Sequence, residues 1–187
     1  HMKLAYLPSP GMVRLRLSAM GDEAGLEREV FNQLEKVKPL IAGYIFGYEN
    51  DKMEEIVGRM LTERKKTLAL AESCSGGYIS HMVTSVPGSS VYYRGTVVPY
   101  SNDLKQRILN VNPVHFTTVG AVSEEVAMEM AKNVRDLLTA DYAISTTGIA
   151  GPGGATVEKQ VGTVWIGIAT PERVFARKVL LGDNRLR

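Results

Sequence analysis

The sequence predicts an α/β protein, in which a three-layer α/β/α domain with a central sheet follows a small α+β module. From about residue 53 onward, short apolar runs typical of strands alternate with segments of helical periodicity, and this alternation implies helices layered on a sheet. Residues 3–50 show too few elements to enclose much core alone. We therefore expect two domains, at residues 3–50 and 53–187 of a chain of 187 residues.

The first module begins with a turn at 8–11, where Pro-Ser-Pro-Gly interrupts the chain. Residues 13–17 then alternate apolar and polar side chains, which is the period of a half-buried strand. Apolar residues recur at helical spacing over 26–37, and Pro39 ends that helix. We interpret the Tyr-Ile-Phe segment at 44–46 as a second strand.

The second domain opens with a helix over 53–61, where apolar residues again recur at helical spacing. Ser123 is the expected N-cap of a later helix, because its side chain can accept a backbone N–H, and the acidic Glu124 and Glu125 then lie at the positive end of the helix dipole. The remaining elements are expected as strands at 67–71, 91–98, 142–146, 163–169 and 174–181, and as helices at 78–84, 103–109 and 124–138.

The composition is that of an ordinary globular protein. The chain carries 22 Lys and Arg against 20 Asp and Glu, a formal net charge of +2, and 44% of its residues are hydrophobic. The basic run Arg64-Lys65-Lys66 fits a solvated helix end, and we expect no direct nucleic-acid partner. The sequence shows no signal peptide and no apolar run of membrane-spanning length, which predicts a cytoplasmic protein without a membrane partner. The single cysteine, Cys74, excludes an intrachain disulfide.

The segment Ala71-Glu72-Ser73-Cys74-Ser75-Gly76-Gly77 carries the most chemical information. It follows a short apolar run and precedes a helix pattern, so we expect a strand that ends in a turn at a helix N-terminus. Backbone N–H groups are free there, and the helix dipole favours negative charge. The hydroxyls beside those donors suit either an anionic ligand or a serine nucleophile with an oxyanion stabiliser. Ser73 is the candidate nucleophile, and Ser75, Gly76 and Gly77 are candidate substrate-binding residues.

Two further loops follow predicted strands and carry small or polar residues. One begins at Tyr100 and reaches Lys105, and the other runs from Thr146 to Gly154. Because ligands in layered α/β folds bind where strands end in loops, we expect all three loops to form one pocket. The candidate pocket residues from these two loops are Tyr100, Ser101, Asn102, Lys105, Thr147, Gly148 and Gly151.

A serine nucleophile needs a base to remove its proton. Neither His81 nor His115 lies in the three loops. Lys105 is the alternative base, because burial or a nearby cation lowers the pKa of a lysine. Cys74 is expected to point away into packing, since the adjacent Ser73 faces the site.

We expect no metal site and no cofactor. The carboxylates of Glu72 and Asp103 are isolated, and the sequence has no His, Asp or Glu cluster at metal-ligand spacing. Glu72 is equally compatible with capping the turn and with a plain structural role.

Five blocks of the sequence together resemble the C-terminal domain of the CinA family, the competence/damage-inducible proteins. They occur in the family's order and extend the resemblance from about residue 53 to the end. The blocks are Ala71-Glu72-Ser73-Cys74-Ser75-Gly76-Gly77, Tyr100-Ser101-Asn102, Gly120-Ala121-Val122-Ser123-Glu124, Thr147-Gly148-Ile149-Ala150-Gly151-Pro152 and Val161-Gly162-Thr163-Val164-Trp165.

The resemblance implies an activity, a fold and partners. The family is known as nicotinamide-nucleotide amidohydrolase, which converts nicotinamide mononucleotide to nicotinate mononucleotide and ammonia in pyridine nucleotide salvage. The resemblance also implies a three-layer α/β fold and a homodimer. Residues 3–50 resemble the middle module of full-length CinA, which implies an upstream molybdopterin-binding-like domain in the whole protein.

The resemblance also assigns residue roles. It implies Ser73 as nucleophile and Lys105 as base, with Tyr100 nearby, and Arg185 corresponds to the arginine of the family's last block. We expect Arg185 and the loop at 148–153 to bind the substrate's phosphate. The alternative is a catalytically weak, nucleotide-binding regulatory module of a larger CinA protein. A nucleic-acid partner is disfavoured by the near-neutral charge.

Overall fold

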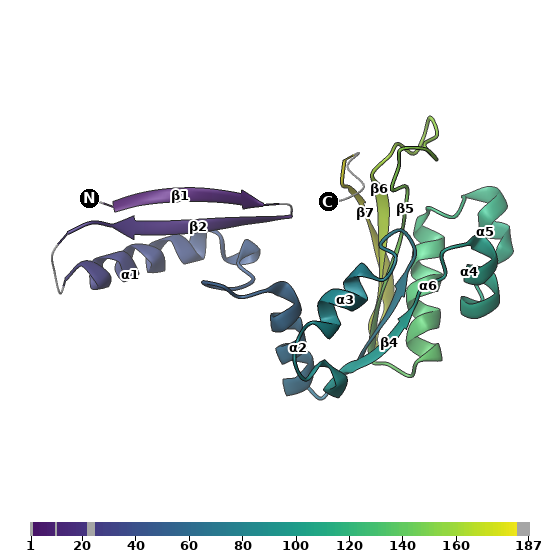
Figure 1. The fold of residues 1–187 in the computed structure, drawn as a ribbon, viewed down its shortest axis with the longest axis horizontal. Coiled ribbons are helices and arrows are strands. Elements are labelled where there is room, and N and C mark those ends of the chain that lie inside the picture. The colour runs from purple at the N-terminus through teal and green to yellow at the C-terminus, as the bar shows by residue number, and fades with distance from the viewer. Residues whose placement is uncertain (1, 10, 22–24, 183–187) are drawn as a thin grey trace. The chain divides into compact units, whose positions relative to one another are not determined.

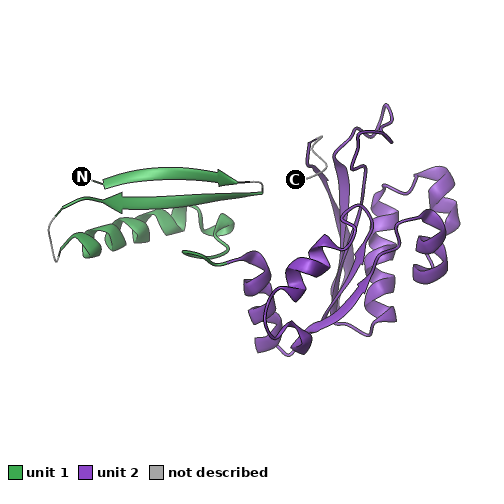
Figure 2. Ribbon diagram, viewed as in Figure 1, with its two compact units in different colours: residues 1–51, 187 green, residues 52–186 purple. Residues whose placement is uncertain are grey.

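The computed structural model describes residues 2–9, 11–21 and 25–182. The chain divides into two compact units between Asp51 and Lys52, coloured separately in Figure 2. The division falls in an irregular segment that precedes the helix beginning at Met53. No helix among the described residues is long and apolar enough to span a bilayer.

Unit 1 is a hairpin followed by one long helix. Its elements are β1 (Met2–Ser9), β2 (Met12–Ala19), α1 (Leu26–Val37) and two short 3-10 helices, η1 (Lys38–Leu40) and η2 (Ala42–Tyr44). The two strands pair antiparallel. The strand predicted at 13–17 and the helix predicted at 26–37 are both confirmed.

Two expectations for unit 1 need correction. Tyr44 ends η2 and residues 45–47 are irregular, so the strand predicted at 44–46 is wrong. Three apolar residues in a row fit the pattern of a strand, but the pattern does not supply the neighbouring strand with which such a segment must pair. The partner of β2 is β1, which the sequence pattern missed because apolar side chains at 4–7 follow one another without alternating with polar ones.

Unit 2 is built around one mixed sheet with the strand order β4-β3-β5-β6-β7 (Figure 1). The three strands β4, β3 and β5 run parallel, whereas β6 and β7 continue the sheet antiparallel. Its elements are α2 (Met53–Glu63), β3 (Leu68–Glu72), α3 (Tyr78–Thr84), η3 (Ser89–Val91), β4 (Tyr93–Val97), α4 (Asn102–Leu109), α5 (Pro113–Thr118), α6 (Glu124–Leu137), β5 (Tyr142–Gly148), β6 (Thr163–Ala169) and β7 (Val174–Leu180).

Alternate residues of the interior strand β3 contribute to two cores, one on each face of the sheet. On one face Ala69 lies in a cluster with Met130 of α6. On the other face Leu68 and Leu70 lie in a cluster with Val83 of α3. Helices therefore cover both faces (Figure 1), which confirms the three-layer α/β/α fold.

Local capping explains where two helices begin. The Ser123 side chain accepts the backbone N–H of Val126 at 3.4 Å, so the predicted N-cap of α6 is confirmed. The sequence reading missed α5, in which Pro113 occupies the first turn and the Asn112 side chain accepts the N–H of Val114 at 3.0 Å. At 6 residues, α5 is too short to show a helical period.

The parallel strands place the chemistry of unit 2 at one edge of the sheet. Because β3, β4 and β5 run in the same direction, the loops that follow them emerge at the same edge. These are the three loops that the sequence marks as candidate pocket segments.

Candidate active site

The segments that follow β3, β4 and β5, together with the segment between α5 and α6, line a cavity of about 290 Å³. Seven of the predicted site residues line it, namely Ser73, Tyr100, Asn102, Lys105, Thr147, Gly148 and Gly151. The other described lining residues are Cys74, Ala121, Val122, Ile149, Ala150, Gly153 and Gly154. The expectation that the three loops share one pocket is therefore met in the structure.

Ser73 follows the last residue of β3 and is only 7% exposed. Its backbone N–H donates to the Thr146 carbonyl at 3.0 Å, which extends the pairing of β3 with β5 by one residue. Two residues later, the Ser75 hydroxyl lies 2.7 Å from that of Thr146. The turn that carries the candidate nucleophile is thus attached to β5 at two points.

Glu72 holds the other side of the same turn. It is fully buried, and its carboxylate accepts backbone N–H groups from Gly77 at 3.0 Å, Ile79 at 3.0 Å and Ser80 at 2.7 Å. These are orphan donors at the start of α3, whose N-cap Gly77 has no side chain to satisfy them. Of the two roles left open for Glu72, the structure shows the capping role.

This capping corrects the expectation that the Gly76 and Gly77 N–H groups are free for an anion. The Gly77 N–H donates to Glu72, and the Gly76 N–H donates to the Ser73 carbonyl at 3.1 Å. Neither glycine lines the cavity, nor does Ser75. The sequence shows a helix N-terminus with glycines, but it cannot show that an internal carboxylate already occupies it.

Cys74 lines the cavity beside Ser73, so the expectation that it serves packing alone is not met. Burial raises the pKa of the Cys74 thiol, and the Thr146 hydroxyl and the backbone N–H groups of Cys74 and Ser75 offset part of that rise. A thiol with a raised pKa is mostly protonated near neutral pH and is a weak nucleophile. The raised pKa disfavours a thiolate at Cys74, and Ser73 is kept as the candidate nucleophile.

Lys105 lies on the first turns of α4 and is only 2% exposed. Its amine donates to the carbonyl oxygens of Pro99 at 3.0 Å and Tyr100 at 3.2 Å. Burial lowers the pKa of Lys105 from its ordinary value of 10.5, and the neighbouring Cys74 raises it by less. A buried lysine with a lowered pKa is the kind of group that serves as a base.

The rest of the α4 loop divides between lining and capping. Tyr100 lines the cavity and is 58% exposed, and Asn102 lines it as the first residue of α4. Ser101 does not line the cavity, because it is the N-cap of α4 and its hydroxyl accepts the N–H of Leu104 at 3.2 Å. The structure therefore shows Ser101 as a helix cap, whereas the sequence predicted it as a substrate-binding residue.

The end of β5 and the loop that follows it need small residues for steric reasons. A Cβ on Gly148 would lie 2.7 Å from the Val164 side chain, and Gly151 has a φ of +76° and would place a Cβ 2.6 Å from Val161. The Thr147 hydroxyl donates to the Ala121 carbonyl at 2.8 Å, which fixes this wall of the cavity. Backbone groups, more than side chains, are what this loop presents to a ligand.

Lys105 is the single charged residue among those that line the cavity in the described part of the chain. His115 instead contacts Glu129 at 3.2 Å, and neither His115 nor His81 lines the cavity. Arg185 lies outside the described residues.

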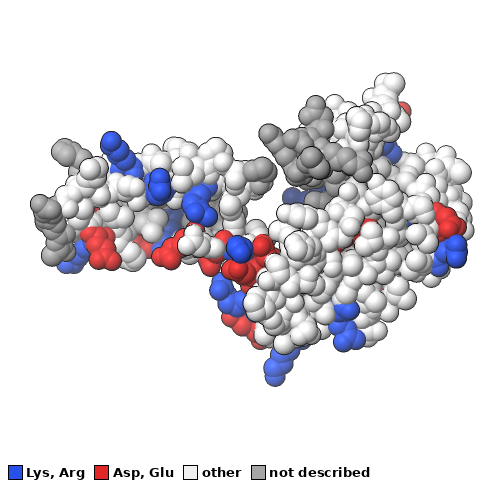
Figure 3. All heavy atoms as spheres, in the orientation of Figure 1, with Lys and Arg blue, Asp and Glu red and all other residues white. Residues whose placement is uncertain are grey.

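Figure 3 shows acidic and basic side chains interspersed on the face in view. Among the described residues, no three His, Cys, Asp or Glu side chains gather at a metal-binding distance.

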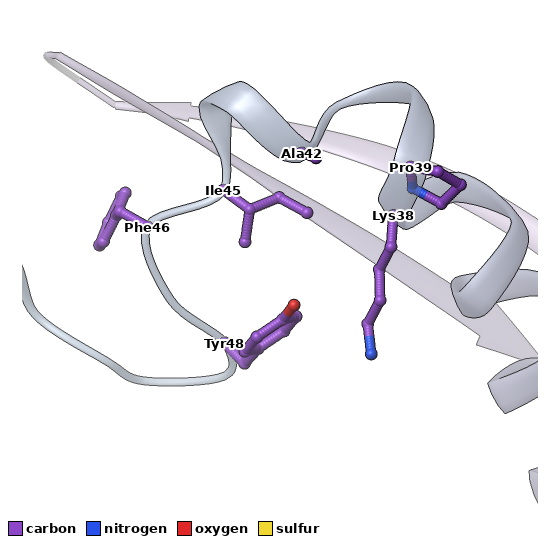
Figure 4. A pocket seen from close by; sticks show the side chains of 6 residues that line it. All are labelled: Lys38, Pro39, Ala42, Ile45, Phe46 and Tyr48. Atoms are coloured by element: carbon purple, nitrogen blue, oxygen red, sulfur yellow. The ribbon is translucent and has the colours of Figure 1, made fainter.

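A second cavity, of about 440 Å³, lies in unit 1 (Figure 4). It is lined by Lys38, Pro39, Ala42, Ile45, Phe46 and Tyr48. The Lys38 amine lies 5.1 Å from the centroid of the Tyr48 ring and also pairs with Glu35. This lining offers no nucleophile with a base, so the cavity in unit 2 is the candidate active site.

Comparisons with known proteins show the family to which unit 2 belongs. The sequence matches the CinA C-terminal domain over residues 50–187. A CinA-like protein of Amoebophilus asiaticus is 47% identical over 188 residues, which cover 99% of this chain and 45% of that relative. The chain thus spans less than half the length of that curated relative.

Solved structures show the same fold. The competence/damage inducible protein CihA from Agrobacterium tumefaciens matches with a TM-score of 0.67 and 33% identity, over 75% of this chain and 88% of that chain. The competence damage-inducible protein A from Klebsiella pneumoniae matches with a TM-score of 0.67 and 29% identity, over 70% and 81% respectively.

Proposed function

Because this chain belongs to the CinA C-terminal domain family, we propose that it hydrolyses the carboxamide of nicotinamide mononucleotide to nicotinate mononucleotide and ammonia. One observation carries the proposal. A buried lysine amine and a serine hydroxyl line the same cavity, with no other charged group among its described lining residues. Phosphate binding alone would not require a lysine whose charge is disfavoured by burial.

The environment of Lys105 suits the neutral amine. A neutral amine has two N–H groups and one lone pair, and the carbonyls of Pro99 and Tyr100 accept two hydrogen bonds from this nitrogen. With both N–H groups engaged, the lone pair is left to accept a proton. Burial also lowers the pKa of Lys105, which favours the neutral amine as well. Lys105 is therefore suited to act as a general base.

In the proposed reaction, the Ser73 oxygen attacks the carboxamide carbon while its proton passes to the Lys105 nitrogen. The charge on the former carbonyl oxygen needs N–H donors, each worth about 3–4 kcal/mol in well-studied hydrolases. Within the turn, the backbone N–H group of Cys74 is the candidate, because Cys74 lines the cavity and the N–H groups of Gly76 and Gly77 are engaged. Protonated Lys105 then gives its proton to the departing ammonia, and water hydrolyses the acyl-enzyme.

The cavity suits one part of the substrate in particular. Ala121, Val122 and Ile149 provide an apolar lining for a pyridine ring, and about 290 Å³ is near the lower end for small-molecule sites. The ribose and phosphate then extend toward the glycine loop. In this proposal the phosphate is bound by the loop at 148–153 together with Arg185.

The test is incubation of the purified protein with nicotinamide mononucleotide, with nicotinate mononucleotide measured by mass spectrometry and ammonia by a coupled assay. Ser73→Ala should abolish both products. The matched control is Ser85→Ala, an exposed serine at the end of α3, which should keep wild-type turnover. Full activity of the Ser73 variant would rule out the serine mechanism.

A second candidate is a nucleotide-binding module without turnover. It is favoured by one observation, that the hydrogen bonds of the Lys105 amine go to backbone carbonyls and none joins it to the described Ser73 hydroxyl. Calorimetry separates the two candidates. Binding of nicotinamide mononucleotide without release of ammonia would support the binding module, and turnover would exclude it.

A further inference from the structure

We propose that Glu72 is a positioning residue for Ser73, which fixes the nucleophile by fastening the start of α3 to the end of β3. This inference deepens the proposed function and rests on it. Glu72 is the residue before Ser73, is fully buried and does not line the cavity, so it acts through the turn and not on the substrate.

The geometry gives the turn two anchors. On the strand side, Glu72 pairs in register with Thr146 of β5, and the N–H of Ser73 continues that pairing. On the helix side, the Glu72 carboxylate accepts three backbone N–H groups within 3.0 Å, from Gly77, Ile79 and Ser80. Only four residues, 73–76, lie between the anchors, so they have little freedom to move.

The glycines make this closure possible. Gly76 has a φ of +62° and Gly77 a φ of +100°, which residues with a side chain rarely adopt. The left-handed backbone turns the chain back so that the Gly77 N–H reaches the carboxylate of Glu72. The function of the two glycines is then to bring α3 to Glu72, and the substrate's phosphate has no place at this helix end.

Glutamine is the informative substitution, because it keeps the size of the side chain and removes acceptor capacity. The carboxylate accepts with both oxygens, Oε2 from Gly77 and Ile79 and Oε1 from Ser80. In Glu72→Gln one of these oxygens becomes an NH₂ donor. It opposes at least one N–H group, and the start of α3 loosens.

The experiment measures the position of Ser73 without using the nucleotide substrate. An alkyl fluorophosphonate labels an activated serine: the Ser73 oxygen bonds to phosphorus, the P–F bond breaks, fluoride leaves, and the proton passes to Lys105 and then to solvent. Mass spectrometry gives the labelling rate. We expect Glu72→Gln to label at least about tenfold more slowly, since misplacement of a reacting group by 1 Å can cost about 10²-fold. The variant's kcat should fall by a similar factor with KM little changed.

The matched control is Glu129→Gln. Glu129 also accepts a backbone N–H, from Asn112 at 2.7 Å, but it does not line the cavity or contact the turn at 73–77. It should lose some stability and keep the wild-type labelling rate. Amide exchange followed by NMR should show faster exchange at Ile79 or Ser80 in Glu72→Gln alone.

Glu72→Asp keeps the charge and shortens the side chain, and it replaces the glutamine variant if that variant does not fold. Slow labelling of Glu72→Asp supports positioning, because charge alone then does not suffice. Wild-type labelling in either folded Glu72 variant overturns the inference, as does unchanged amide exchange at the start of α3. If the wild type is labelled but does not hydrolyse nicotinamide mononucleotide, the proposed function fails and the inference stands. A wild type that resists labelling at Ser73 overturns both.

Discussion

Lys105→Met tests the central feature of the site, a buried lysine that acts as a base. Methionine has nearly the length of lysine but cannot take up a proton. General bases typically contribute about 10²–10⁴-fold to rate, so we expect kcat to fall by that factor with KM little changed. At about 1.4 kcal/mol per factor of ten, this corresponds to about 3–5 kcal/mol in the activation free energy.

The same substitution has a predictable effect on stability. The carbonyls of Pro99 and Tyr100 each lose a donor, at 3.0 and 3.2 Å in the wild type. The Pro99 carbonyl is the buried one of the two, and losing its donor there costs about 1–3 kcal/mol, whereas the Tyr100 carbonyl is only partly buried. Part of this cost is offset, because methionine does not bring a polar amine into the interior. We expect the variant to fold with reduced stability.

The pH dependence has a definite sign. Burial lowers the pKa of folded Lys105 below its unfolded value of 10.5, so between those two values the unfolded chain binds more protons. The free energy of unfolding of the wild type therefore rises with pH across that window, by at most about 1.4 kcal/mol per pH unit from this group. The variant lacks this contribution, and its stability deficit should widen as pH increases.

Two assays check these effects. Ammonia release across pH should show kcat/KM of the wild type rising as Lys105 loses its proton, with a pKa below 10.5. Urea unfolding of both proteins over the same pH range gives the stability difference. A methionine variant with kcat within about tenfold of the wild type would refute the base assignment. Parallel pH–stability curves would refute the lowered pKa.

Three further predictions concern the surrounding structure. Alkylation of Cys74 by iodoacetamide should be slow at neutral pH, because burial raises the pKa of this thiol, and nicotinamide mononucleotide should slow it further by filling the cavity; mass spectrometry measures both rates. Tyr92→Phe should raise the free energy of unfolding by about 1 kcal/mol, because the buried Tyr92 hydroxyl has no hydrogen-bond partner among the described residues. Gly167→Ala should lower it by about 3 kcal/mol, because a Cβ there would lie 2.2 Å from the Ala127 carbonyl oxygen. Fast alkylation of Cys74 that nicotinamide mononucleotide does not slow would contradict the first prediction. In urea unfolding, a lower free energy of unfolding for Tyr92→Phe would contradict the second, and an unchanged one for Gly167→Ala would contradict the third.

The sequence predicted those parts of the fold whose signals are local and periodic. The strand predicted at 67–71 rests on the apolar run at 68–71 and lies at Leu68–Glu72 in the structure, and α6 combines a helical period with Ser123 as its cap. The sequence could not predict β1, which owes its place to pairing with β2 and not to its own pattern. The hydrophobic pattern of β5, β6 and β7 also does not predict that these strands pair antiparallel. The relative direction of two strands depends on how the chain connects them across the sheet.

For the site, the sequence predicted proximity better than it predicted orientation. Loops after parallel strands must emerge at one edge, and this rule brought Ser73, Lys105 and Thr147 to one cavity. It could not show which N–H groups at 73–77 are already engaged, because those bonds depend on the fold of the turn. Cys74 illustrates the same limit, since both it and Ser73 line the cavity although they are adjacent in the chain.

Two ionisable side chains flank the nucleophile turn, and the backbone satisfies both. Glu72 is 0% exposed and accepts three N–H groups, whereas Lys105 is 2% exposed and donates to two carbonyls. The three N–H groups suit a carboxylate, which only accepts, while two carbonyls match the two N–H groups of a neutral amine. Arginine cannot replace Lys105 in this setting, because a guanidinium stays charged and presents five donors to two acceptors. Lys105→Arg should therefore be as inactive as Lys105→Met, which would show in the same ammonia assay that the site requires a removable proton and not a positive charge.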